Sequence, residues 1–321
     1  MNDELTPPKG EEIDALLSDL LKEVQKWEGT LAGGTKLGVG AEAVDSLFKT
    51  KVSFGNPQDK LIRLTEETFK NSGTVLIDIY KQQMRDQFDF YYMSFTVDLR
   101  PERGAQFWRL TCELDFGTEG SKEPIIQSLF PSDKWRSVMS FGVGMDVGLG
   151  GDLEWSIGID SSQLAQLLPS IPDNLKASVS TKDNLKAFLA VPAYDYQLGY
   201  SEIITNGEGN SLCYWRINDD NLQRIGTAKF AIVFKVLKGT DSITVRGTVW
   251  AEPKMNWLTS TLEDVATALS ERFQRLLGQG DDAASQFARG DAELWKLTLP
   301  PWGAAGIPAS AIRSGETETR R

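Results

Sequence analysis

The chain has 321 residues, a formal net charge of −11 and no histidine, with 40% hydrophobic and 25% charged residues. These values are ordinary for a globular protein and exclude a wholly disordered chain, and no run reaches the roughly 18 apolar residues of a membrane helix. The missing histidine excludes Ser-His-Asp and Cys-His catalysis and zinc sites built on imidazole. Because the chain is acidic and lacks a basic patch, we expect no nucleic-acid partner.

The two cysteines, Cys112 and Cys213, each lie in a strand-like pattern and fit small buried apolar residues. The sequence shows neither a signal peptide nor a dense cysteine framework, so we expect a cytoplasmic setting. Gly34-Thr35-Lys36 lacks the spacing of a phosphate-binding loop, and no strand is predicted before it. We therefore expect no cofactor.

The first predicted element is an amphipathic helix in GEEIDALLSDLLKEVQKWEG, which ends at Gly29. Its apolar stripe consists of Ile13, Leu16, Leu17, Leu20, Leu21, Val24 and Trp27. Such a stripe usually packs on its own domain. The alternative is docking on a partner protein or a second copy, with Ile13, Leu17, Leu20, Val24 and Trp27 as the candidate contacts. A glycine-rich connector then leads into a short helix at 41–49.

The next elements are a weak strand at 59–64 and a segment at 74–80 that fits either a strand or a helix. Residues 91–99 are apolar at odd positions and residues 107–116 at even positions, which predicts two strands. We predict that they form a hairpin around a loop at 101–104, with Val97 opposite Trp108 and Phe95 opposite Leu110. Residues 117–134 are predicted to be a loop with a helical turn around 125–130.

The longest alternating pattern in the chain is WRSVMSFGVGMDVGLGGDLEWSIGID, residues 135–160. Odd positions are almost all apolar, and even positions are mostly glycine, serine or acidic residues. This predicts a β-hairpin with one buried face and one nearly bare face, around a loop at 149–151. The rest of the chain is interpreted as organised around this hairpin.

The bare face, with Gly142, Gly144 and Gly148, has three interpretations. It can be covered by another layer of the same fold, or it can be the surface where a partner or ligand meets the backbone. The third is a hairpin that inserts into a membrane, because lipid-facing strands alternate in this way and each arm is near the length that spans a bilayer. In lipid a single hairpin leaves unpaired strand edges, so this interpretation requires several copies.

Acidic residues on these strands are weak candidates for a metal site. Asp146, Asp152 and Glu154 share the polar face of 135–160, and Glu113 and Asp115 form a similar pair. Solvated acids are the commoner explanation, and the spacing of a calcium loop is absent, so we expect no metal. Aromatic residues could line a ligand cleft, although aromatics in strands mostly belong to the core: Tyr91, Tyr92, Tyr194, Tyr196, Tyr200, Tyr214 and Trp215.

The second half contains four further predicted strands. Residues 190–204 and 211–217 flank a glycine-rich turn at 206–210. Residues 229–237 and 242–251 flank Gly239-Thr240, which predicts a tight hairpin with Phe234 facing Val245. A C-terminal helix is predicted to start at a capping box, Ser260 to Glu263, and to end at Gly278. LWKLTLPPW could then add an edge strand.

These elements predict an α+β protein. Its core is a mostly antiparallel, sandwich-like β-sheet, with amphipathic helices at the N- and C-termini. The expected organisation is a helical segment with its connector at 1–50, a β-core with the C-terminal helix at 51–302, and a polar tail at 303–321. Two related halves, about 51–160 and 161–302, remain open.

For function we expect a non-catalytic protein that binds another protein or assembles with itself. The alternative is a membrane-active, pore-forming protein that uses residues 135–160. A second alternative is an enzyme without histidine that uses a carboxylate or metal site.

Overall fold

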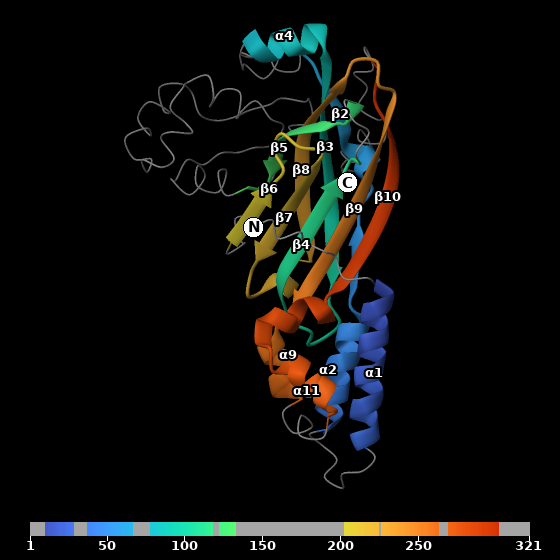
Figure 1. Cartoon of the computed structure of the whole chain (residues 1–321), viewed down its shortest axis with the longest axis vertical. Coiled ribbons are helices and arrows are strands. Elements are labelled where there is room, and N and C mark those ends of the chain that lie inside the picture. The colour runs from blue at the N-terminus through green and yellow to red at the C-terminus, as the bar shows by residue number, and fades with distance from the viewer. Residues whose placement is uncertain are drawn as a thin grey trace, which may run out of the picture.

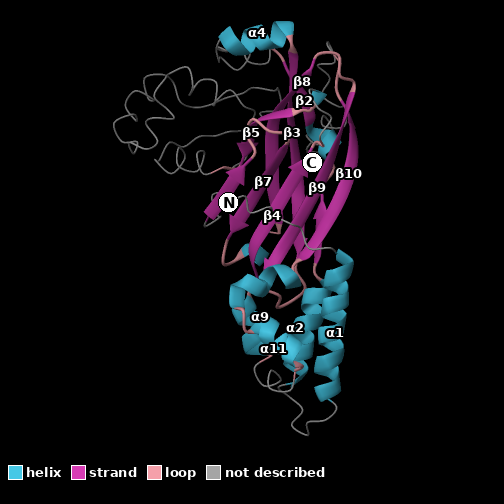
Figure 2. Cartoon of the chain, in the orientation of Figure 1, coloured by secondary structure: helices cyan, strands magenta, loops and turns pink. Residues whose placement is uncertain are grey.

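The computed structural model describes residues 10–28, 37–66, 78–117, 122–132, 202–224, 226–262 and 269–301. Within them two antiparallel sheets lie face to face (Figure 1). Four helices gather at one end of the sandwich, and a fifth, α4 (Asp78–Asp86), lies at the opposite end (Figure 2). The chain is therefore an α+β protein, as the alternating patterns and terminal helices predicted.

Each sheet has five strands, and all the strand pairs that join them are antiparallel. Sheet A has the order β1 (Lys51–Phe54), β3 (Phe88–Arg100), β8 (Thr227–Leu237), β5 (Ile125–Phe130), with β2 (Leu61–Leu64) also paired to β3. Sheet B has the order β10 (Arg289–Thr298), β9 (Ser242–Pro253), β4 (Phe107–Asp115), β7 (Leu212–Asn218), β6 (Glu202–Asn206). Short 3-10 turns occur at η1 (Pro57–Lys60), η4 (Leu222–Arg224) and η5 (Gly280–Phe287).

The two predicted long hairpins are wrong in their pairing. β3 and β4 are strands, but β3 lies in sheet A and β4 in sheet B; β8 and β9 are divided in the same way. The chain crosses from sheet A to sheet B between β3 and β4, and again between β8 and β9. As a result β3 pairs with β8, and β4 pairs with β9. Phe95 of β3 lies opposite Phe230 of β8, and Leu110 of β4 lies opposite Ala251 of β9. Alternation shows which face of a strand is buried but not which strand it pairs with. Two strands in facing sheets both turn their apolar face inward, and so do two neighbours in one sheet.

The core between the sheets is built on aromatic side chains from three strands. Trp215 of β7 is fully buried, and its ring centroid lies 5.1 Å from that of Phe230 and 5.9 Å from that of Phe95. Cys112 and Cys213 are buried free thiols, and burial raises the pKa of both. This core continues into the helical end as one cluster, so the sandwich and the helices stabilise each other.

Residues 125–130, predicted as a helical turn, form β5 instead. Ile126 and Leu129 both face the core although they are three residues apart, a spacing that imitates a helix. A bulge between Ile126 and Ser128 causes this, because one extra residue shifts the inward phase of the strand.

The N-terminal helices are confirmed. α1 (Gly10–Glu28) ends next to the predicted stop at Gly29, and α2 (Leu37–Lys49) includes the helix predicted at 41–49 but begins earlier. Leu17, Leu20 and Val24 of α1 are fully buried. The start of β10 holds α1 in place, because the Arg289 guanidinium pairs with Asp14 of α1 and donates to the Thr50 carbonyl after α2 (3.3 Å).

The predicted capping box of the C-terminal helix is wrong. Ser260 lies inside α9 (Met255–Thr261), and its hydroxyl donates to the Trp257 carbonyl at 3.0 Å rather than capping a new helix. α11 (Glu271–Leu277) follows and ends at Gly278, as predicted. The predicted start at Ser260 is later than the observed start of α9. This helix follows β9 after a single residue, Lys254, which offers no capping side chain as a sequence signal.

The remaining predictions divide as follows. The β6–β7 hairpin and the edge strand β10 are confirmed, and residues 190–201 of the first predicted strand lie outside the described residues. The weak strand at 59–64 is η1 followed by β2, and the described part of 74–80 belongs to α4. Residues 135–160 lie outside the described residues, as does the tail at 303–321. Both described sheets are formed by strands from elsewhere in the chain.

Candidate functional site

The apolar stripe of α1, predicted as a docking surface, is placed inside the molecule. Ile13 is 3% exposed and Leu17, Leu20 and Val24 are 0% exposed, while Trp27 packs half-buried against the same core. This chain therefore covers its own stripe. Docking of a partner on it would first require α1 to leave the core.

The other predicted site residues lie outside the described residues. These are Gly142, Gly144 and Gly148 on the bare face and Asp146, Asp152 and Glu154, the metal candidates. Within the described ranges no group of three or more Cys, Asp or Glu side chains is positioned to hold a metal ion. Of the second acidic pair, Asp115 instead accepts from Arg246 at 2.6 Å, and burial raises the pKa of Glu113.

The predicted aromatic cleft does not form from its described members. Trp215 is in the core, and Tyr91 faces the core too, stacked on Phe234 at 5.7 Å. Tyr92 lies on the opposite face of sheet A, and Tyr214 on the outer face of sheet B. Tyr194, Tyr196 and Tyr200 lie outside the described residues.

The two strands that flank segment 133–201 in the sequence lie at the same margin of the sandwich. The segment follows β5, at the edge of sheet A, and precedes β6, at the edge of sheet B. The turn after β6 is bonded to β5: the Ile126 amide donates to the Asn210 carbonyl (2.9 Å) and the Gly209 amide to the Ile126 carbonyl (2.8 Å). Figure 1 shows both edges on the same side of the molecule. Sequence analysis missed this arrangement because the β5 strand was not recognised.

The outer face of sheet A, which points away from the core, has an apolar, buried region near α4 and β5. Phe90 and Tyr92 of β3 are 3% and 5% exposed, Val233 of β8 is 6% exposed, and Phe130 at the end of β5 is 3% exposed. Burial raises the pKa of Tyr92 to about 12 and lowers that of Lys235 on the same face. This dry face reaches the point where the chain enters segment 133–201.

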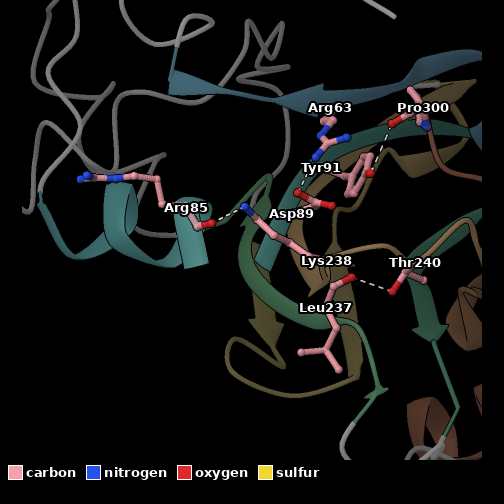
Figure 3. A network of polar contacts seen from close by, with 8 residues as sticks. All are labelled: Arg63, Arg85, Asp89, Tyr91, Leu237, Lys238, Thr240 and Pro300. Atoms are coloured by element: carbon pink, nitrogen blue, oxygen red, sulfur yellow. Dashed lines mark hydrogen bonds and ion pairs between the residues drawn. The ribbon is translucent and has the colours of Figure 1, made fainter. Parts of the chain in front are cut away.

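A polar network holds together the end of the sandwich that carries α4. Arg63 of β2 and Asp89 of β3 form an ion pair, with side chains 13% and 9% exposed. Beside it the Tyr91 hydroxyl donates to the Pro300 carbonyl (3.3 Å), just beyond β10, and Lys238 donates to the Arg85 carbonyl of α4 (Figure 3). These contacts join both sheets and α4, so we assign them a structural role.

The outer face of sheet B carries a polar row across β4, β7 and β9. Arg109 of β4 donates to Asn218 of β7 (3.1 Å) and to Glu252 of β9 (3.3 Å), and its guanidinium lies 3.9 Å from the centroid of the Trp108 ring. Burial raises the pKa of Glu252, and the charge of Arg109 opposes that shift. The row is paired from strand to strand, which favours a structural role here as well.

Comparisons with known proteins assign no family. No family model and no curated protein matches the sequence. A solved structure, Clostridium perfringens delta-toxin, aligns with 63% of this chain and 83% of its own chain, at 9% sequence identity and a TM-score of 0.21. A likeness at this level is too weak to assign a fold or a function to this chain. Among the described helices, none combines the length and apolar composition that crossing a bilayer requires.

Proposed function

We propose that this chain is a non-catalytic, membrane-active protein that assembles with copies of itself and inserts residues 135–160 into a bilayer. The observation that carries the proposal is the alternation of these residues together with their place in the chain. They belong to one long segment that leaves and re-enters at the same margin of the sandwich. The two sheets and the core between them are formed by the described strands.

The composition of residues 135–160 suits a strand pair in lipid. The apolar residues occupy one face over both arms, and the other face carries glycine, serine and acids. Strands that contact lipid on one side and water on the other alternate in this way, with about nine to eleven residues per crossing. The stretch contains no proline, so every residue in it keeps its backbone donor.

Assembly follows from the backbone. Hydrocarbon offers no partner for unpaired N–H and C=O groups, so an isolated hairpin in a bilayer has two costly edges. Neighbouring copies remove these edges by pairing their hairpins side by side. Self-association, expected from the sequence, is thus part of the same proposal.

A partner-docking role for α1 has less support than the sequence suggested. The stripe on which that role depended is covered by the core of this chain. We therefore place the functional contacts in residues 135–160 rather than on α1.

The test is dye release from loaded lipid vesicles, with variants matched across the two faces. Ile157→Glu puts a charge on the apolar face, which costs about 2–4 kcal/mol at the centre of a bilayer when the charge is basic and less when it is acidic. Ser156→Glu puts the same charge on the polar face one residue away. We expect the natural chain and Ser156→Glu to release dye, and Ile157→Glu to release much less.

Two outcomes would contradict the proposal. One is that the intact chain and the proteolysed chain both leave vesicles sealed. The other is that Ile157→Glu and Ser156→Glu release dye equally, because release would then not depend on the apolar face. Circular dichroism of both variants in the absence of lipid controls for folding.

A further inference from the structure

The dry region on the outer face of sheet A is continuous across four strands. Leu64 of β2 pairs with Phe90 of β3, and Tyr92 of β3 pairs with Val233 of β8, so these side chains point to the same side of the sheet. At the other margin Phe130 of β5 pairs with Ala231 of β8. All the members are buried although they point away from the core: Leu64, Phe90, Tyr92, Phe130, Ala231 and Val233.

The described elements do not account for this burial. Sheet B packs on the opposite face, and of the described helices only α4 lies at this end of the sandwich (Figure 2). Gln83 of α4 accepts from Lys235, next to the dry region (3.3 Å). However, no side chain from Lys81 to Asp86 of α4 is buried. A helix that packs closely on a sheet buries a stripe of its own side chains, so α4 alone does not keep Tyr92 dry.

A cover from outside the described ranges is therefore required, and chain continuity favours segment 133–201. Phe130 belongs to the dry region, and Pro131 and Ser132 after it are also buried. The chain thus reaches residue 133 without leaving the buried surface. The other segment nearby, 67–77, joins β2 to α4, and the chain reaches it through Glu66, which is exposed.

We propose that residues 135–160 cover the dry region in water, with their apolar face packed on sheet A. The odd-numbered residues of this stretch supply one long apolar face, from Met139 to Ile159. A strand pair that lies flat on a sheet packs such a face about 10 Å from it. The opposite face, with Asp146, Asp152 and Glu154, then points to water, where carboxylates are solvated.

This arrangement gives the apolar stretch a position in water, to which the proposed membrane insertion is an alternative. Packing on sheet A and contact with lipid both remove the same apolar side chains from water. The inference itself depends on the dry region and holds whether or not the stretch enters a bilayer. Its tests therefore contain no lipid, and their failure is distinct from a failure of dye release.

The rate of thiol labelling in the full-length chain tests the cover. Val233→Cys places a reactive group in the dry region. Phe141→Ser combined with Val143→Ser removes two apolar side chains from the proposed cover, and Gly142→Ser combined with Gly144→Ser is the matched control on the other face. We expect the labelling of Val233→Cys to be slow in the natural chain and in the control. It should be at least about tenfold faster with the apolar pair changed, because local opening exposes the thiol more often.

The native thiols separate local opening from unfolding. Cys112 and Cys213 are buried between the sheets, so they react only when the sandwich itself opens. Their labelling should stay slow in every variant. Thr244→Cys, on the exposed outer face of sheet B, should label quickly in all of them.

Disulfide trapping shows which face of the stretch lies on sheet A. Val233→Cys is combined with one further cysteine at each position from 139 to 149, and a bond forms where the two Cβ atoms come within about 3.5–4.5 Å. The proposal predicts bonds to odd positions, such as Val143→Cys, and none to even positions, such as Gly144→Cys.

Three results would overturn the proposal. One is fast labelling of Val233→Cys in the natural chain, which would show that the dry region is open to water. Another is disulfide formation that is equal at odd and even positions, or absent from all of them. The third is labelling that becomes faster with Leu76→Ser and not with the pair Phe141→Ser and Val143→Ser, because the cover would then be segment 67–77.

Discussion

The two sheets treat their outer faces differently. In sheet A the outward residues Tyr92 and Val233 are buried, whereas in sheet B the outward row of Arg109 is polar and partly solvated. Their sequences differ accordingly: β3 and β8 contain unbroken apolar runs, FYYM and FAIVF, while β4 and the first half of β9 alternate. A continuous run marks a strand buried on both faces, and alternation marks a strand with one wet face. The outward residues of sheet A at Phe90, Tyr92 and Val233 are thus dry, whereas those of sheet B at Thr244, Arg246 and Leu294 are exposed.

The largest expected effect is that of a charge placed on the dry face. Val233→Asp buries a carboxylate opposite Tyr92 and should lower the free energy of unfolding by about 4 kcal/mol or more. Thr244→Asp puts the same charge on the exposed outer face of sheet B and should change it by less than about 0.5 kcal/mol. Urea denaturation measures both. Equal losses would contradict the contrast between the faces.

The second-largest expected effect is the difference in stability between an ion pair of sheet A and one of sheet B. Arg63–Asp89 in sheet A is nearly buried, whereas the Arg246 side chain of the Arg246–Asp115 pair in sheet B is 59% exposed. Arg63→Ala leaves a buried carboxylate and should cost about 3 kcal/mol. Arg246→Ala should cost less than about 1 kcal/mol. Urea denaturation measures the free energy of unfolding of both variants. A small loss of that free energy in Arg63→Ala would contradict the prediction and show that water reaches this end of the sandwich.

A smaller effect concerns pH and the buried carboxyl of sheet B. Burial raises the pKa of Glu252 above its usual value of 4.5. The folded state therefore holds this proton more tightly, so stability from this group is present below pH 4.5 and is lost as pH rises through the raised pKa. Glu252→Gln should flatten that part of the curve of unfolding free energy against pH. A slope unchanged in Glu252→Gln would assign it to other groups.

The smallest effect is spectroscopic. Burial on the outer face of sheet A raises the pKa of Tyr92 to about 12. Because this pKa exceeds that of an unfolded tyrosine, the stability it contributes is lost as pH rises from 10 towards 12. Ultraviolet titration of Tyr92→Phe should lack one tyrosine that ionises near pH 12 and keep those that ionise lower. Loss of a tyrosine ionising near pH 10 instead would mean that this face is wet.

Local structure was predictable because it depends on neighbours in the sequence. The stripe of α1, the β6–β7 hairpin and the inward phases of β3, β4, β8 and β9 all follow from residue periodicity. The choice of sheet partner did not follow, because a crossing between sheets and a hairpin within one sheet leave the same alternation. The unbroken apolar runs in β3 and β8 do indicate strands with two buried faces.

Contacts between segments that are distant in the sequence could not be predicted from residue periodicity. Arg63 meets Asp89, and Arg289 meets Asp14, only after the sheets have assembled. The bulge in β5 hid a strand, and with it the margin to which segment 133–201 is anchored. The candidate residues within that segment were found from alternation alone, which predicts their two faces and not their surroundings.

The most direct test of membrane insertion is a scan of single cysteines carrying an environment-sensitive fluorophore through residues 141–148. The native thiols, Cys112 and Cys213, are buried, so labelling reports the introduced site. With vesicles present, the proposal predicts a period of two, in which Val143→Cys and Met145→Cys report lipid while Gly144→Cys and Asp146→Cys report water. Spectra that do not change when vesicles are added, or that shift equally at all positions, would contradict it.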